Sequence, residues 1–121
     1  MINEFLEEVK NKRQSTELSQ LQIEVDTLIQ SMGGYWTPFA MFLSLAEEVG
    51  ELARQINHYE KVKIKKPTEP KKGLDEEIGD TLYSLICLAN YYKIDLAESL
   101  RGVMEKYRKR DANRYASAKK E

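Results

Sequence analysis

The sequence contains little cysteine, histidine or proline, and it has no long apolar run. It has one cysteine, one histidine and three prolines in 121 residues. The single cysteine, Cys87, excludes an internal disulfide, and its apolar neighbours predict a small buried core residue. No uncharged apolar stretch is long enough to cross a bilayer, and the N-terminus lacks the basic start and apolar core of a signal peptide. We therefore expect a cytoplasmic protein.

The sequence also lacks an excess of charge of either sign. Its 19 basic and 20 acidic residues give a formal net charge of -1. Binding to nucleic-acid polymers or to membrane surfaces generally needs a large basic excess, so we expect neither partner. A chain with 41% hydrophobic and 32% charged residues is typical of one globular domain with a modest core. A domain this small buries only part of its surface, so a partner subunit would help to stabilise it.

Helical periodicity runs through most of the chain, and no alternating stretch indicates a strand. One helix is predicted from Leu18 to the pair Gly33-Gly34, which is a natural helix end. The next helix is predicted to begin at Pro38, with Thr37 as its N-cap. Two more helices are expected over 74–92 and from about residue 95 onward. The sequence therefore predicts an all-α protein, arranged as a bundle of about four helices.

We expect the chain to consist of a central domain with a short extension at each end. The expected parts are an N-terminal helical extension over 1–17, a domain over 18–115 and a charged tail over 116–121. Within the domain, residues 60–73 are rich in lysine and proline and predict a solvated loop. The third helix is apolar on most sides from Leu82 to Ala89, which predicts a buried, central helix. Because four short helices cannot cover all of this surface, we expect a homodimer or homotetramer.

The most informative feature is a set of carboxylates inside two of the predicted helices. Glu47, Glu48 and Glu51 share one sector of the second helix, since Glu47 and Glu51 lie ~40° apart around the axis. Glu77 and Asp80, spaced i, i+3, share a face of the third helix. Like charges at these spacings cost tenths of a kcal/mol per pair, so something should offset their repulsion.

Two interpretations fit these acids from spacing alone. They can be solvated helix faces, or they can bind a hard divalent cation such as Mg²⁺, which prefers oxygen ligands. A di-iron bundle site would need Glu-x-x-His pairs. The one histidine, His58, does not stand in such a pair, which argues against di-iron.

The order and the flanks of these acids resemble a known family. The chain is similar to the MazG-like family of all-α nucleoside triphosphate pyrophosphatases, and most of all to its small single-domain bacterial members. The likeness covers roughly residues 18–115. The residues that carry it are Glu47-Glu48-x-x-Glu51 within LAEEVGELARQINH, Glu77-x-x-Asp80 within EEIGDTLYSLICLAN, Gly34-Tyr35-Trp36-x-Pro38, and Lys106-x-x-x-Arg110-Asp111-x-x-Arg114.

The resemblance implies a function and a role for particular residues. The implied activity is magnesium-dependent hydrolysis of nucleoside triphosphates to monophosphate and pyrophosphate, including deoxy or non-canonical nucleotides, with Mn²⁺ as a possible substitute ion. The implied metal ligands are Glu48, Glu51, Glu77 and Asp80. Glu47 would be either the base that orients the attacking water or a ligand of a second ion. The implied phosphate contacts are Lys106, Arg110 and Arg114, and the base-site candidates are Trp36, Asn57 and His58.

Each candidate residue that is not an acid also has a plain structural interpretation. The basic residues of the last helix can simply be solvated and complement the helix dipole. Trp36 can be a core residue, His58 a surface residue at a helix end, and Asn57 a cap. Two other functions also remain open, a non-catalytic helical module for nucleotide or metal binding or for assembly, and a phosphoribosyl-ATP pyrophosphohydrolase.

Overall fold

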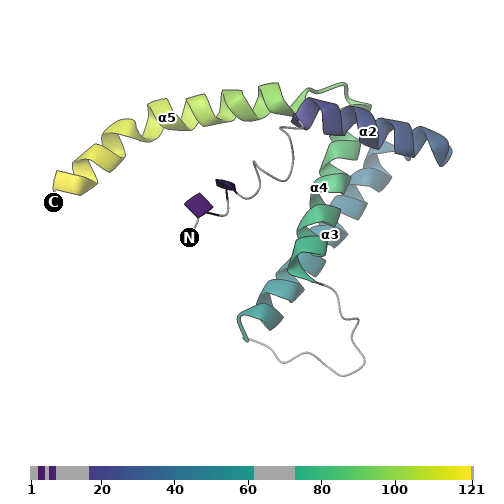
Figure 1. Ribbon diagram of the computed structural model, residues 1–121, viewed down its shortest axis with the longest axis horizontal. Coiled ribbons are helices and arrows are strands. Elements are labelled where there is room, and N and C mark those ends of the chain that lie inside the picture. Colours follow the sequence, from purple (N-terminus) through teal and green to yellow (C-terminus); the bar gives the residue numbers. More distant parts are fainter. Residues whose placement is uncertain (1–2, 5, 8–16, 62–72, 121) are drawn as a thin grey trace. The chain divides into compact units, whose positions relative to one another are not determined.

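A computed structural model describes residues 3–4, 6–7, 17–61 and 73–120. Within these ranges the chain is helical and has no strand, which confirms the all-α prediction. The N-terminal extension expected over 1–17 and the loop expected over 60–73 fall mostly outside the described residues. The four helices, labelled in Figure 1, are α2 (Leu18–Ser31), α3 (Pro38–Tyr59), α4 (Leu74–Tyr91) and α5 (Leu96–Lys120).

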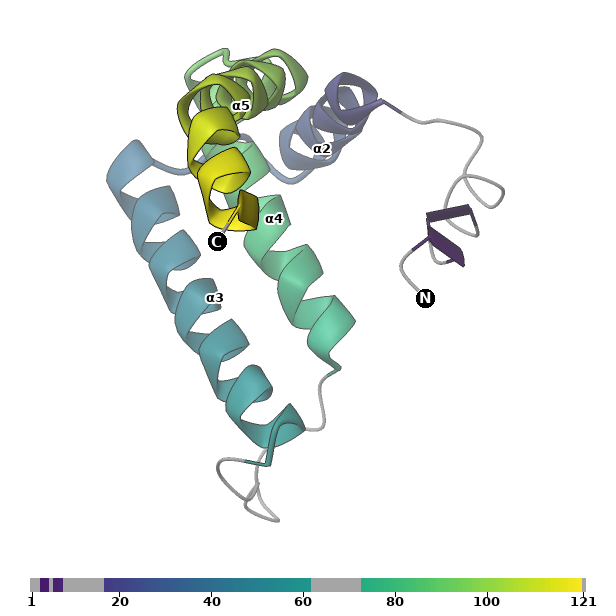
Figure 2. The same ribbon diagram turned by 90° about the vertical axis from the view of Figure 1, so that its left-hand side faces the viewer.

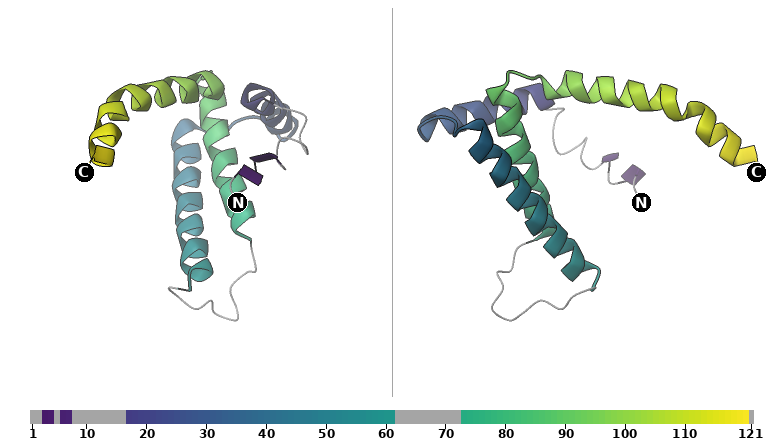
Figure 3. Two further views of the ribbon diagram at one scale, coloured as in Figure 1. Left: turned by 60° about the vertical axis from the view of Figure 1, so that its left-hand side comes forward. Right: turned by 180° about the vertical axis from the view of Figure 1, so that it is seen from behind.

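The chain forms two compact units. One unit contains Val25–Ile94, and the other contains Met1–Glu24 together with Asp95–Glu121. In the first of these, α3 and α4 lie side by side and run in opposite directions, as Figures 2 and 3 show. Their packing is the one extensive helix–helix contact in the part of the chain that the structure describes. This antiparallel hairpin carries the candidate site.

Glycines end α2 where the sequence predicts. The backbone N–H of Gly34 donates to the carbonyl of Ile29 at 2.9 Å, and Gly33 and Gly34 have φ angles of 108° and 99°. This pattern is a Schellman motif, which needs a residue in the left-handed region directly after the helix. Glycine adopts that conformation without the steric penalty of a Cβ atom. The chain can therefore turn sharply before α3 begins.

The predicted start of α3 is confirmed. Thr37 has extended backbone angles, and its side-chain oxygen accepts a hydrogen bond from the backbone N–H of Ala40 at 3.2 Å. Pro38 occupies the first turn, where its missing N–H costs nothing. The cap fixes the residue at which α3 begins, and the side chains several turns later face α4.

The core of the hairpin unit is small. The buried hydrophobic residues of the described chain are Met41, Ile86, Cys87 and Ala89. On α4, Leu82 and Leu85 are each 43% exposed, although the apolar run predicts a buried central helix. The reason is that α3 covers only one side of α4 extensively. The other apolar side of α4 is therefore exposed in the single chain.

The other unit is organised around the start of α5. Asp95 accepts hydrogen bonds from the backbone N–H groups of Ala97 and Glu98, so it acts as the N-cap of α5. It also accepts a 2.9 Å hydrogen bond from the Ser19 hydroxyl, and this bond is the main cause of a lowered pKa of Asp95. The helix continues to Lys120, so the charged tail expected from residue 116 is helical almost to its end. None of the described helices is long and apolar enough to span a membrane.

Candidate active site

Three carboxylates from α3 and α4 meet between the two helices. Glu48 comes from α3, and Glu77 and Asp80 come from one face of α4. Ligand oxygens of the three side chains all lie within 4.8 Å of one another. Glu77 is 1% exposed, and it is the one side chain below 2% exposure among the described residues. A fully buried carboxylate beside two half-buried ones is not a solvated helix face.

This cluster has the donor set of a site for a hard divalent cation. At 4.8 Å, two unit charges repel by roughly 3 kcal/mol for an effective dielectric constant of about 20. Burial adds a desolvation cost, because the Oε2 atoms of Glu48 and Glu77 are both buried. An all-oxygen carboxylate set suits Mg²⁺ or Mn²⁺, and a bound cation would offset both costs. The residues therefore fit the metal that the resemblance implies.

The cluster opens into a pocket in the same unit. The pocket has a volume of about 410 Å³, and Glu48 and Asp80 are in its wall. Trp36, a predicted base-site residue, also lines it and is 67% exposed. The remaining lining residues are Ile29, Met32, Gly34, Tyr35, Met41, Ser44, Tyr83, Ser84 and Cys87. The pocket thus combines carboxylates with an aromatic face and an otherwise largely apolar lining.

The hydroxyl of Tyr35, a residue in the pocket wall, forms hydrogen bonds with two other side chains. The hydroxyl donates to Asp26 Oδ1 at 2.6 Å and accepts from Asn90 Nδ2 at 3.1 Å. Burial, followed by the hydrogen bond to Asp26, raises the pKa of Tyr35 to about 12. The phenol is therefore neutral at physiological pH. It links the second half of α2, the segment before α3 and the end of α4.

Cys87 is buried, as its apolar neighbours predict. Burial raises the pKa of its thiol, so it is a neutral side chain in the pocket wall. Burial likewise raises the pKa of Tyr83, which contacts Cys87. Neither group carries charge at neutral pH, so the negative charge of the pocket is concentrated at the carboxylates.

Two of the predicted acids stand apart from the cluster. Glu47 and Glu51 are both exposed on α3, and neither belongs to the group of oxygens within 4.8 Å. Asn57 and His58 are half-buried near the end of α3 and do not line the pocket. His58 is ten residues beyond Glu48 on the same helix, or ~15 Å along its axis. The structure therefore brings together three of the four predicted ligands and one of the three base-site candidates.

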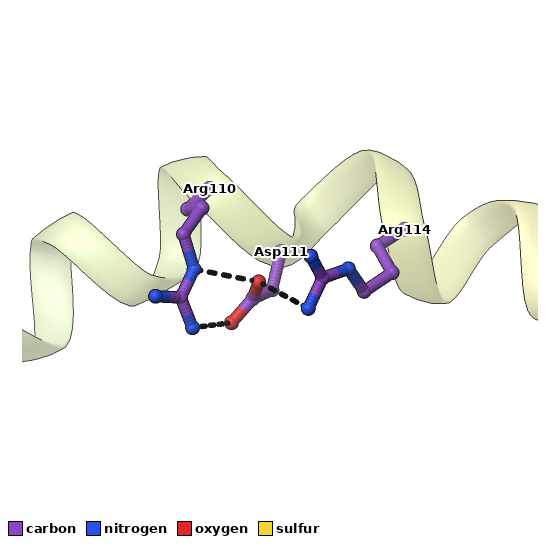
Figure 4. Close-up of polar contacts among 3 residues, drawn as sticks. All are labelled: Arg110, Asp111 and Arg114. Atoms are coloured by element: carbon purple, nitrogen blue, oxygen red, sulfur yellow. Dashed lines mark hydrogen bonds and ion pairs between the residues drawn. The ribbon is translucent and has the colours of Figure 1, made fainter.

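The predicted phosphate contacts lie on α5, in the other unit. Lys106, Arg110 and Arg114 are all exposed. Asp111, 9% exposed, binds Arg110 through two hydrogen bonds of 2.9 and 3.0 Å and lies 3.6 Å from Arg114, as Figure 4 shows. One carboxylate thus holds two guanidinium groups on the same side of the helix.

An aromatic ring joins the same basic group. The Tyr107 ring lies under Arg110 at 4.4 Å and under Lys106 at 5.1 Å, within the range of cation–π attraction. Arg110 is therefore held on two sides, by the ring and by the Asp111 carboxylate. These contacts order the basic side chains along α5, and contact with phosphate remains a prediction for them.

Several pocket residues are not among the sequence-predicted candidates, although spacing could have indicated them. Ser44 precedes Glu48 by four residues, and Ser84 follows Asp80 by four. Side chains four residues apart share a helix face, so each serine lies one turn from a carboxylate. The signal was therefore present, but which turn lines a pocket depends on how α3 and α4 pack.

Comparison with known proteins identifies close relatives. Residues 37–115 match the MazG nucleotide pyrophosphohydrolase domain. The chain is 48% identical over 99 residues to YpjD of Bacillus subtilis (strain 168), covering 81% of this chain and 89% of that protein. It is 34% identical over 84 residues to YvdC of the same organism, covering 62% of this chain and 79% of that protein.

Two solved structures share the fold. The crystal structure of YpjD from Bacillus subtilis is similar with a TM-score of 0.69 and 46% identity, covering 77% of this chain and 96% of that one. The crystal structure of the Bacillus-conserved MazG protein, a nucleotide pyrophosphohydrolase, has a TM-score of 0.64 and 38% identity, covering 77% and 90%.

Proposed function

This chain belongs to the MazG nucleotide pyrophosphohydrolase family and is a pyrophosphatase hydrolase, and we propose that it hydrolyses nucleoside triphosphates to monophosphate and pyrophosphate with Mg²⁺. Deoxy or non-canonical nucleotides are included among the proposed substrates. Mn²⁺ is the expected substitute ion. The expectation of a cytoplasmic protein stays a prediction, as do the domain boundaries.

One observation carries the proposal. A buried and two half-buried carboxylates converge from α3 and α4, and two of them line a pocket whose wall includes an exposed tryptophan. Cation ligands next to an aromatic face suit a molecule with a polyanionic end and a planar end. A nucleoside triphosphate has both. Holding three acids together at such a cost favours a cation-binding role over a purely structural one.

We assign roles by position. Glu48, Glu77 and Asp80 would hold the cation, because their oxygens already lie within 4.8 Å of one another. Glu51 follows Glu48 by three residues and is proposed as a further ligand from the next turn of α3. Glu47, adjacent to Glu48 and exposed, is proposed as the base that orients the attacking water or as a ligand of a second ion.

The remaining roles concern binding rather than bond cleavage. The bound cation would neutralise phosphate charge, stabilise the pyrophosphate leaving group and lower the pKa of a water. Trp36 would stack on the base, since its ring is exposed in the pocket wall. Asn57 and His58 are weaker base-site candidates, because they lie outside the pocket lining. Lys106, Arg110 and Arg114 are proposed to contact the phosphates of a substrate bound by the same or by a neighbouring subunit.

We further propose that the protein is a homodimer or homotetramer. The hairpin leaves regular apolar stripes exposed on both of its helices. Their spacing alternates between three and four residues, the pattern of a helix seam that packs against other helices. The exposed residues of the stripes are Phe39, Phe42, Ala46, Val49, Ala53 and Ile56 on α3, and Ile78, Leu82 and Leu85 on α4. A second copy of the hairpin would cover them and complete a four-helix bundle.

The reaction can be tested by product analysis in isotopically labelled water. A panel of ribo- and deoxynucleoside triphosphates and phosphoribosyl-ATP is incubated with protein and Mg²⁺ in water enriched in ¹⁸O. Because water is proposed to attack the α-phosphorus, pyrophosphate and a monophosphate are expected, with the label on the monophosphate. Release of inorganic phosphate and a diphosphate as first products would contradict the proposal. Activity limited to phosphoribosyl-ATP would favour the alternative reaction.

A further inference from the structure

The pocket wall on α3 is arranged in turns. Met41, Ser44 and Glu48 all line the pocket, and they follow one another at steps of three and four residues. Such steps keep side chains on one face of a helix. At 1.5 Å per residue, Ser44 lies ~6 Å and Met41 ~10 Å from Glu48 along the axis. The segment with Trp36 lies further on in the same direction, before the helix begins.

The wall on α4 repeats this order in reverse. Asp80, Ser84 and Cys87 line the pocket at steps of four and three residues. Because the helices run in opposite directions, equal steps keep the two walls level. Glu48 and Asp80 belong to one cluster, so Ser44 and Ser84 lie level with each other one turn away. The pocket thus has a carboxylate level, then a hydroxyl level, and then a level of sulfur-containing side chains.

The chemistry of a nucleotide follows the same order. Its phosphates, sugar and base are joined in a row, and the proposed function puts phosphates at the carboxylates and the base at Trp36. The sugar then falls between them, beside the hydroxyl level. We infer that Ser44 and Ser84 form a sugar-binding pair. Their hydroxyls hydrogen-bond to hydroxyl groups of the sugar and so determine which sugar the protein prefers. This inference rests on the proposed function.

Burial of Ser84 makes the pair selective, although Ser44 is only half-buried. Ser84 is 9% exposed, so its hydroxyl lies where water competes poorly for hydrogen bonds. A buried hydroxyl paired with a substrate hydroxyl disfavours the analogue that lacks it, because the protein group then loses its partner. Serine also has no propensity advantage over alanine in the interior of a helix. Two serines at one level of one pocket are therefore better explained by binding than by helix formation.

The test compares sugars on a constant base. For each base, kcat/KM is measured with the ribo-, 2′-deoxy- and 2′,3′-dideoxynucleoside triphosphate, using wild-type protein, Ser44→Ala and Ser84→Ala. The control is Ser99→Ala, the same chemical change at an exposed position of α5 that does not line the pocket. Circular dichroism verifies that each variant keeps its helical content, which an alanine substitution within a helix should favour.

The expected result is discrimination that depends on the serines. For wild-type protein and Ser99→Ala, kcat/KM should differ between two neighbouring sugars of the series. Ser44→Ala or Ser84→Ala should reduce the ratio of those two kcat/KM values by about tenfold. Equal ratios in all four proteins would overturn the inference, as would a wild type that treats all three sugars alike. Both results leave pyrophosphate release intact. Absence of pyrophosphate release from every nucleotide would instead overturn the proposed function, and the inference with it.

Discussion

The hydroxyl of Tyr35 donates a 2.6 Å hydrogen bond to the carboxylate of Asp26, and so connects the approach to α3 with α2. The same hydroxyl accepts from Asn90 on α4. Removing it in Tyr35→Phe should therefore loosen one end of the pocket. We expect a loss of about 1–2 kcal/mol in the free energy of unfolding at neutral pH, measured by urea denaturation. Tyr59→Phe, at an exposed position of α3, is the matched control.

The pH dependence of the Tyr35 contribution has a definite sign. Its pKa in the folded protein is about 12, against about 10 for an unperturbed tyrosine, so folding favours the protonated phenol. The stabilisation is complete below pH ~10 and is lost as the pH rises toward ~12. The stability difference between wild type and Tyr35→Phe should shrink across that window. A difference that stays constant up to pH 12 would contradict the assignment.

Metal binding should be visible without any substrate. Chelator-treated protein is expected to melt several degrees higher with saturating Mg²⁺, since a ligand at 100 times its Kd adds about 2.7 kcal/mol. Glu77→Gln should abolish this shift and all pyrophosphate release. Its metal-free form should be at least as stable as the wild type, because a buried repelling charge has been removed. The control is Glu76→Gln, one residue away but exposed. An unchanged Mg²⁺ shift in Glu77→Gln would reject the metal site.

The N-cap of α3 gives a prediction about stability alone. Thr37→Ala removes the acceptor of the 3.2 Å bond from the N–H of Ala40 and should lower the free energy of unfolding by about 1 kcal/mol. Thr37→Ser keeps the oxygen and should stay within a few tenths of a kcal/mol of the wild type. The measurement is urea denaturation. Equal losses in both variants would show that the methyl group matters rather than the cap.

Asp111 should affect the use of substrate through the arginines that it holds. Asp111→Asn weakens the two-point contact with Arg110 and the ion pair with Arg114. If those arginines contact phosphates, KM should rise several-fold, with a smaller change in kcat. The control on the same helix is Glu105→Gln, which removes the ion-pair partner of Arg108. Equal kinetics in both variants would count against a phosphate role for α5.

The lowered pKa of Asp111 predicts how this contact depends on pH. The hydrogen bond from Arg110 is its main cause, so the carboxylate stays ionised to a lower pH than usual. Its stabilising contribution is complete above the ordinary value near 4 and is lost only as the pH falls through the lowered pKa.

Assembly can be disrupted at the exposed stripe of α3. Ile56 is 45% exposed in the single chain, and a homo-oligomer would bury it. Ile56→Glu should shift the sedimentation coefficient at micromolar concentration toward that of a 14.1 kDa monomer. Arg54→Glu, at an exposed position off the stripe, should leave the oligomer unchanged. A monomeric and fully active wild type would refute the assembly proposal.

Local signals made the helices predictable from the sequence. Gly33-Gly34 and Thr37 each mark a helix end through the hydrogen bonds of the adjoining turn, and those bonds form as expected. The exposure of Leu82 and Leu85 was not predictable in this way. It depends on how many helices one chain packs around α4, and periodicity does not carry that information.

The candidate site was predictable only in part, for a related reason. The spacing of Glu77 and Asp80 placed them on one face of α4, and resemblance supplied Glu48 as their counterpart on α3. The distinction between Glu48, inside the cluster, and Glu51, outside it, depends on the rotation of α3 about its axis. The sequence did not predict that Ser44 and Ser84 lie at the same level, because this depends on the register of α3 against α4. That register is a tertiary property.

The matched levels of side chains on the two antiparallel helices also determine where the chain can tolerate insertions and deletions. A substitution at one level leaves the other levels in place, since each contributes its own side chains. Deleting a single residue between Ser44 and Glu48 would instead rotate one of them by ~100° relative to the other, and so remove either the hydroxyl or the carboxylate from the pocket. An insertion of seven residues would leave a rotation of only ~20°, but would separate the levels by two turns. Insertions and deletions should therefore be excluded from residues 41–48 and 77–87, which carry the carboxylates, the serines and the sulfur-containing side chains.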